Sequence, residues 1–214
     1  MKQAKNLNTK TSVSGIDFTN ASLKESVAKT PLKSGGASFK THTLVKESSS
    51  KLIYKPSIAM ALFAFVFLAV GLAVVFFSAN TLINSIDYDS KAEFISLFFG
   101  LIFATAGVLM FYFFYMPRVF DKQHNLYYKT HKFKLHYNKS KKWSTYIPLK
   151  NIRALQIIGE TISSDKGNYN SFELNLVLED GSRKNVVDHG SLKTIIDDAH
   201  VISEFLNVPI WHAK

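Results

Sequence analysis

Hydrophobic and polar positions divide the chain into four stretches of different character. Two uncharged runs, residues 58–77 and 94–116, are each long enough for a helix that crosses a bilayer, because twenty helical residues rise about 30 Å. Neither run has the polar face of a helix in a water-soluble core. A polar loop, residues 78–93, separates the two runs. The pattern predicts a transmembrane hairpin over residues 57–116.

The residues before this hairpin are mostly polar. Fifteen of the first fifty are Ser or Thr and eight are Lys, whereas only two are Phe and none is Trp or Tyr. So little apolar surface cannot offset the entropy of ordering the chain. We therefore expect residues 1–56 to form a disordered basic tail. A tail that docks on acidic lipid or on a partner is the alternative.

Residues 117–214 follow the period of two that is typical of strands. Apolar residues alternate with polar ones most clearly at Leu174 and Leu176, and Asp180-Gly181 then predicts a tight hairpin turn. We expect strands over residues 132–137, 142–147, 152–158, 172–178 and 184–188, with a polar loop at 159–171.

A helical period replaces the strand pattern near the end of the chain. Apolar residues recur at steps of three and four, at Leu192, Ile195, Ile196, Ala199, Ile202, Phe205 and Leu206. Ser191 is the expected N-cap, Asn207 and Pro209 end the helix, and Asp197 and Asp198 are assigned to its solvated side.

These elements predict an α+β membrane protein. The transmembrane hairpin is followed by a small antiparallel β-rich domain with one C-terminal amphipathic helix, similar to a pleckstrin-homology (PH)-like split barrel. Residues 117–214 form this domain, and the helix closes the open end of the sheet. Leu174, Leu176, Ile195 and Phe205 are expected to be buried together in its core.

Charge then orients the predicted hairpin. The net charge is +7 over residues 1–57, −2 over the loop 78–93 and +5 over residues 117–214, within a total of +10. Basic segments next to transmembrane helices stay in the cytoplasm. We therefore expect both termini to be cytoplasmic and the protein to be integral to a membrane, most simply the bacterial inner membrane.

The most basic part of the chain directly follows the hairpin. Residues 118–153 hold ten basic residues and a single acidic one, and aromatic residues are interleaved with them. Three interpretations stay open: a solvated strand face with topogenic charge, docking on anionic lipid headgroups, and an acidic protein partner. No nucleic-acid motif is present, so nucleic acid is not an expected partner. The candidate lipid or partner surface comprises Arg118, Lys122, Lys132, Lys134, Lys139, Lys141 and Lys142.

Small residues recur in the second apolar run, where they allow close helix–helix approach in lipid. They are Ser96, Gly100, Ala104 and Gly107. We expect them to pack the hairpin together, and self-association or a partner helix is the alternative. Neither run holds an ionisable residue, which argues against ion or proton transport.

The sequence offers no catalytic constellation. The chain has no cysteine, so thiolate nucleophiles and Cys-ligated metals are excluded. P-loop, zinc-protease and nucleophile-elbow motifs are absent. His131 and His136 are five apart in a strand pattern and point to opposite faces, and Asp188-His189 is interpreted as a helix-start or loop contact. No enzymatic activity, cofactor or metal is expected.

Several short motifs together carry a family resemblance. They are Phe120-Asp121-Lys122, the segment from Ile147 to Ile152, the Leu174-x-Leu176 strand, and the segment from Phe205 to Ile210. Over about residues 57 to 211, the chain resembles the thylakoid photosystem I assembly factor family and, more broadly, bacterial two-helix proteins with a PH-like cytoplasmic domain. The polar tail and the 159–171 segment depart from this pattern.

The resemblance implies a layout and a class of role: a membrane hairpin, an interaction domain, no enzymatic activity and an assembly-type function. No residue indicates a chlorophyll-protein client. We therefore expect a non-enzymatic integral membrane scaffold whose PH-like domain binds a protein client or anionic headgroups at the cytoplasmic surface. The alternative is a membrane immunity or accessory protein that acts through its hairpin.

Overall fold

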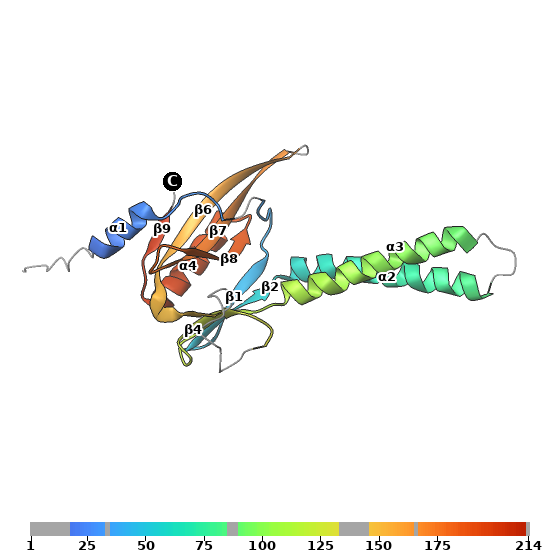
Figure 1. Ribbon diagram of the computed structural model, residues 1–214, viewed down its shortest axis with the longest axis horizontal. Helices are drawn as coiled ribbons and strands as arrows, with labels where there is room; N and C mark the ends of the chain where they lie inside the picture. The colour runs from blue at the N-terminus through green and yellow to red at the C-terminus, as the bar shows by residue number, and fades with distance from the viewer. Residues whose placement is uncertain (1–17, 33–34, 85–89, 133–145, 165–166, 213–214) are drawn as a thin grey trace, which may run out of the picture.

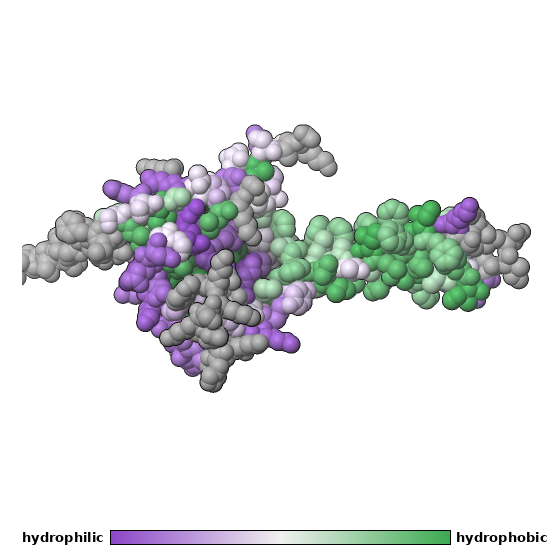
Figure 2. All heavy atoms as spheres, viewed as in Figure 1, coloured by the Kyte–Doolittle hydropathy of each residue, from purple (hydrophilic) through white to green (hydrophobic). Residues whose placement is uncertain are grey.

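The computed structural model describes residues 18–32, 35–84, 90–132, 146–164 and 167–212. Two long helices form a rod that projects from a β-rich domain, and the two strands that join the rod lie in one sheet (Figure 1). The rod is covered by apolar side chains, whereas the domain surface is mostly hydrophilic (Figure 2). The structure is therefore α+β, as the sequence predicts.

The rod consists of α2 (Ile58–Asn84) and α3 (Ser90–Phe114). Ser57 caps α2, because its Oγ accepts a hydrogen bond from the Met60 amide at 3.2 Å. Both helices are long and apolar enough to span a membrane. They also extend into the polar segment 78–93 that the sequence assigns to a loop, since no helix-breaking Gly or Pro interrupts that segment.

The first sheet has five antiparallel strands in sequential order: β1 (His42–Ser48), β2 (Lys51–Pro56), β3 (Arg118–Asp121), β4 (Leu126–Lys129) and β5 (Tyr146–Pro148). The helical rod is an insertion between β2 and β3, because Leu52 pairs with Phe120 and Tyr54 pairs with Arg118.

This pairing corrects two predictions. Residues 42–56 are strands rather than part of a disordered tail, and the domain is not confined to residues 117–214. Strand β2 pairs with the adjacent β1, but its other neighbour is β3, which lies across the whole helical insertion. Local composition could not indicate this second pairing. The strand predicted at 132–137 lies mainly outside the described residues, as does most of the strand predicted at 142–147.

The second sheet has the order β8-β7-β6-β9. Its strands are β6 (Ile152–Ser164), β7 (Gly167–Leu178), β8 (Arg183–His189) and β9 (Ile210–His212), and a short 3-10 turn, Leu149–Asn151, precedes β6. The strands and turn predicted over 152–158 and 172–188 are confirmed, with Gly181 in the turn at φ 77°. The predicted loop at 159–171 is wrong, because β6 and β7 continue as a paired arm in which Ile162 lies opposite Tyr169.

Helix α4 (Leu192–Leu206) packs against the inner face of the second sheet. Ser191 caps its start and Asn207 ends it in the left-handed conformation, as predicted. Leu174, Leu176 and Ile195 are fully buried in the main core, and Phe205 packs partly buried against them. The prediction that these four residues share a core is confirmed.

Residues 27–32 and 35–37 run along the outer face of the second sheet. Helix α1 (Phe18–Ser26) leads to Val27, which is buried against Ala154, Val177 and Trp211. The chain then continues over the sheet, where buried polar side chains bind its backbone. Gln156 Nε2 donates to the Ala28 carbonyl at 3.0 Å, the Leu32 amide donates to Glu173 Oε2 at 3.0 Å, and the Ala37 amide donates to Ser171 Oγ at 2.9 Å.

Candidate functional site

The predicted basic surface is only partly described. Lys122 and Lys132 are exposed, and Lys122 Nζ lies 4.4 Å above the Phe205 ring. Arg118 differs from the prediction, because it is half-buried and its Nε and Nη1 atoms are fully enclosed. The remaining predicted members, Lys134, Lys139, Lys141 and Lys142, lie outside the described residues.

The predicted small residues of the second run lie at the contact between α2 and α3. Gly100 and Gly107 are buried, and a Cβ at Gly107 would lie 2.6 Å from the Leu68 amide nitrogen. Ala104 is matched by Gly71 of α2, where an added Cβ would clash with the Ala104 backbone. The helices are thus in contact through residues that have almost no side chain.

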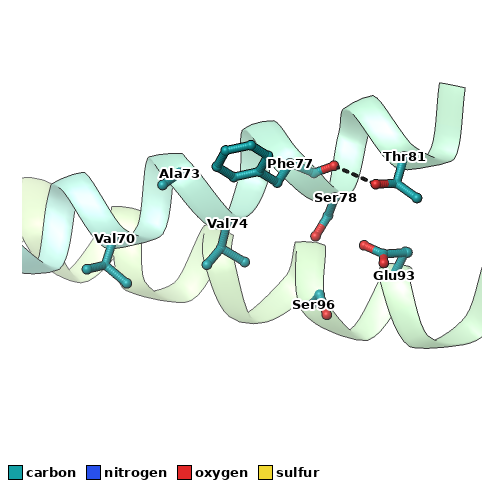
Figure 3. A pocket seen from close by; sticks show the side chains of 8 residues that line it. All are labelled: Val70, Ala73, Val74, Phe77, Ser78, Thr81, Glu93 and Ser96. Atoms are coloured by element: carbon teal, nitrogen blue, oxygen red, sulfur yellow. Dashed lines mark hydrogen bonds between the residues drawn. The ribbon is translucent and has the colours of Figure 1, made fainter. Parts of the chain in front are cut away.

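A shallow groove between the helices lies at the end of the rod farthest from the domain. Figure 3 shows an apolar stretch at Val70, Ala73 and Val74 that gives way to hydroxyl and carboxylate groups. The polar end is formed by Ser78, Thr81, Glu93 and Ser96. Thr81 donates a 3.0 Å hydrogen bond to the Phe77 carbonyl, so its hydroxyl is satisfied within α2.

A second group of polar side chains lies inside the β domain, near the base of the rod. Among the described residues, six from six different elements gather here, and together they have seven buried nitrogen or oxygen atoms without a hydrogen-bond partner. One further such atom, Asn175 Oδ1, lies apart from them, on the residue that binds Glu173 on β7. They are His42 Nε2, Tyr54 OH, Arg118 Nε and Nη1, Tyr127 OH, His189 Nε2 and Asp198 Oδ2. We call these six residues the polar cluster.

Strand register places the polar cluster at one end of the core. Tyr54 pairs with Arg118, and Arg118 pairs with Lys129, so these three side chains lie on the same face of the first sheet. Tyr127 is in the next cross-strand row, beside Phe120 and farther from the rod. The core is therefore apolar in its middle and polar at the end from which α2 and α3 leave.

Thr41 connects the two histidines of the polar cluster and fixes their tautomers. Its hydroxyl donates to the Asp188 carbonyl at 2.7 Å and therefore accepts from His42 Nδ1 at 2.9 Å. Its amide donates to His189 Nδ1 at 3.2 Å. In neutral rings, His42 Nε2 then carries no hydrogen, although the Phe114 backbone lies within reach of this ring. His189 Nε2 carries a hydrogen and faces Asp198 Oδ2 at 3.6 Å.

Burial and neighbouring charge perturb the ionisation of the polar cluster. Burial, followed by the charge of Arg118, lowers the pKa of His42 to about 3, so His42 is neutral at pH 7. Burial also lowers the pKa of the Arg118 guanidinium. Burial raises the pKa of Tyr127 to about 12, and burial together with Asp198 raises the pKa of Tyr54 well above its ordinary value. Both tyrosines therefore remain protonated at pH 7.

Sequence analysis missed most of the polar cluster. Asp198 was assigned to the solvated side of its helix, yet it is buried. The signal was present, because Asp198 lies three residues after Ile195 and four before Ile202, on the apolar stripe. His189 contacts Thr41, in the segment just before β1, so the expected loop contact is present, although the side chain is fully buried.

The described residues contain no group of three or more His, Cys, Asp or Glu side chains arranged to hold a metal ion. What the polar cluster offers instead is a set of oriented hydrogen-bond donors and acceptors around one arginine. Comparisons of the chain with protein-family models, curated proteins and solved structures give no match.

Proposed function

We propose that this protein is a non-enzymatic, membrane-anchored scaffold. In this proposal α2 and α3 cross the membrane as a hairpin, and the β domain is a PH-like interaction module at the cytoplasmic surface that binds a protein client. The position of the hairpin within the domain carries the proposal. Because β2 and β3 are paired neighbours, both ends of the hairpin leave the domain at adjacent points and must lie on one side of a membrane.

The exposure of the rod supports membrane insertion. Large apolar side chains such as Phe76, Phe98 and Phe113 are between 57% and 67% exposed. So large an apolar surface is unfavourable in water and favourable in lipid. Net positive charge on both sides of the hairpin favours the cytoplasmic side for the domain.

The arrangement of the domain supports the PH-like assignment. Two sheets, antiparallel except for the pairing of β6 with β9, enclose one core, and a C-terminal amphipathic helix packs against it. PH-like domains are interaction modules rather than enzymes, so the assignment favours a scaffold or assembly-type role.

The shallow groove between α2 and α3 favours a second candidate function. Ser78, Glu93 and Ser96 place polar groups between the helices at the end far from the domain. Polar groups at this depth can bind a neighbouring transmembrane helix. A membrane immunity or accessory protein that acts through its hairpin would use this surface.

Quantitative affinity purification from native membranes separates the two functions. The whole chain is compared with residues 57–116 alone, both carrying the same tag. A scaffold should enrich its client only through the whole chain. If the hairpin alone enriches the same proteins to the same extent, the scaffold function is wrong and the hairpin-based function is supported.

A further inference from the structure

The two ends of the polar cluster differ in whether the protein itself can supply the missing hydrogen-bond partners. At one end, Asp198 Oδ2 is an acceptor that faces the Nε2–H of His189 at 3.6 Å and lies near the Tyr54 hydroxyl. Small movements of these side chains would satisfy the Asp198 carboxylate within the protein. No bound ligand is therefore required to supply hydrogen bonds at the Asp198 end.

The Arg118 end is different. Arg118 Nε and Nη1 are buried donors without acceptors, and the buried Tyr127 hydroxyl also has no partner. Within the described part of the chain, Arg118 makes no ion pair with a carboxylate. A buried and unpaired guanidinium is costly, because neither water nor a counter-charge compensates its desolvation.

The charges around Arg118 favour a negative occupant. Lys129 pairs with Arg118 across β3 and β4 and is half-buried on the same face. The charges of Arg118 and Lys129 both act on His42. His42 is neutral at pH 7, so it does not compensate either charge. Asp188 is the acidic side chain whose charge reaches Arg118, and its carboxylate accepts a 2.7 Å hydrogen bond from Asn185 Nδ2.

The geometry points to a binding site for a small oxyanion of the phosphate type, held by the Arg118 guanidinium and the Tyr127 hydroxyl. The oxyanion oxygens would accept the N–H and O–H groups that lack partners. Arg118 is half-buried, so the site can open to solvent at its own side chain. Arg118 also lies only four residues after α3 ends.

Two sources can supply this chemistry: a phospholipid headgroup or a free phosphate. The headgroup source rests on the proposed membrane insertion, because Arg118 would then lie near the phosphate layer. The free anion does not depend on insertion. The test therefore has one arm for each source, and it is carried out on the full chain in detergent.

The measurement is the thermal unfolding midpoint of the full chain with and without each probe. The probes are inorganic phosphate, phosphatidylglycerol, and diacylglycerol as a lipid without phosphate. A ligand that binds only the folded state raises the midpoint. We expect phosphate or phosphatidylglycerol to raise it at constant ionic strength, and diacylglycerol not to do so.

Variants connect this effect to the site. Tyr127→Phe removes only a hydroxyl that has no partner within the protein, so it should fold normally and weaken binding by about tenfold. Its matched control is Tyr128→Phe, which changes the neighbouring residue on the opposite face of β4. Arg118→Met should abolish binding, whereas Lys193→Met, the same charge change at an exposed position outside the candidate lipid surface, should not.

A response to phosphatidylglycerol alone would identify the headgroup as the source, and an equal response to inorganic phosphate would identify a free anion. The inference is overturned if neither probe stabilises the wild-type chain, or if Tyr127→Phe responds exactly as the wild type does. Neither result bears on topology or on the client, so this failure is distinguishable from failure of the proposed function.

Discussion

Asp198 and His189 show how single side chains give this core its polar end. Both are buried, yet they lie on elements whose other inward residues, such as Ile195 and Val187, are apolar. A buried polar group is costly unless it is partnered. Thr41 forms a hydrogen bond with Nδ1 of each histidine, His42 and His189. These two bonds orient the imidazole rings within the polar cluster.

Protonation of His42 should make stability depend on pH. The folded-state pKa of His42 is lowered from 6.5 to about 3 by burial and by Arg118, which outweigh the opposing effect of the Phe114 carbonyl. His189 and Lys129 lower it further. Between these values the unfolded chain binds a proton that the folded chain does not. His42 therefore contributes full stability above pH 6.5, and about 1 kcal/mol is lost for each unit that the pH falls through this window.

Urea unfolding of the full chain in detergent at pH 7, 6 and 5 measures this dependence. His42→Asn should flatten it, because the Asn amide can still donate to Thr41 Oγ1 and does not titrate. His200→Asn, at an exposed histidine, should leave it unchanged. Equal slopes for His42→Asn and the wild type would show that His42 is not the group responsible.

A charge in the main core should unfold the domain. Leu176 is fully buried beside Leu174 and Ile195, so Leu176→Asp would place an unpaired carboxylate there. We expect a loss of about 4 kcal/mol or more. Circular dichroism melting measures it, with Leu192→Asp at an exposed position of α4 as the control. An unchanged melting temperature for Leu176→Asp would mean that the register of β7 is displaced by one residue.

Elements with a strong local period could be predicted from the sequence, and elements held by distant contacts could not. Helix α4 has both a cap and an apolar stripe, and β7 alternates cleanly, so both were found. Strand β9 is three residues long and pairs in parallel with β6, which no local pattern reveals. The polar cluster was missed because its six side chains come from elements between His42 and Asp198.

Close packing of α2 against α3 should depend on Gly71. Any Cβ there would clash with the Ala104 backbone, so Gly71→Leu should separate the helices and destabilise the hairpin by about 1–3 kcal/mol. Unfolding of the full chain in detergent measures the change. Val70→Leu, at a neighbouring exposed position, is the control and should have little effect. Equal stability of the two variants would contradict this packing.

The segment that follows α1 should be held on the second sheet by its apolar anchor. Val27 is only 3% exposed, so Val27→Asp should release the segment, whereas Ser26→Asp at an exposed position should not. Hydrogen exchange of the Leu32 and Ala37 amides reports the release, because both amides donate to side chains of β7. Unchanged protection of these amides in Val27→Asp would show that Val27 is not the anchor.

For the whole molecule, the domain should fold without its helical rod. Residues 57–116 are an insertion between β2 and β3, which are paired neighbours. A short turn containing Asn-Gly can therefore replace them and join β2 directly to β3. We expect this shortened chain to be soluble, with a cooperative melting transition monitored by tryptophan fluorescence, to which the buried Trp211 contributes. An insoluble or unfolded product would contradict the assignment of β1 and β2 to the domain.

The central claim is that a hairpin inserted between β2 and β3 anchors the domain at the cytoplasmic surface. Because the chain has no cysteine, single cysteines can report on which side of the membrane each part lies. In intact cells, a membrane-impermeant maleimide should label Tyr88→Cys, and it should label Glu204→Cys only after the membrane is opened. Labelling of Glu204→Cys in intact cells, with Tyr88→Cys protected, would contradict the account.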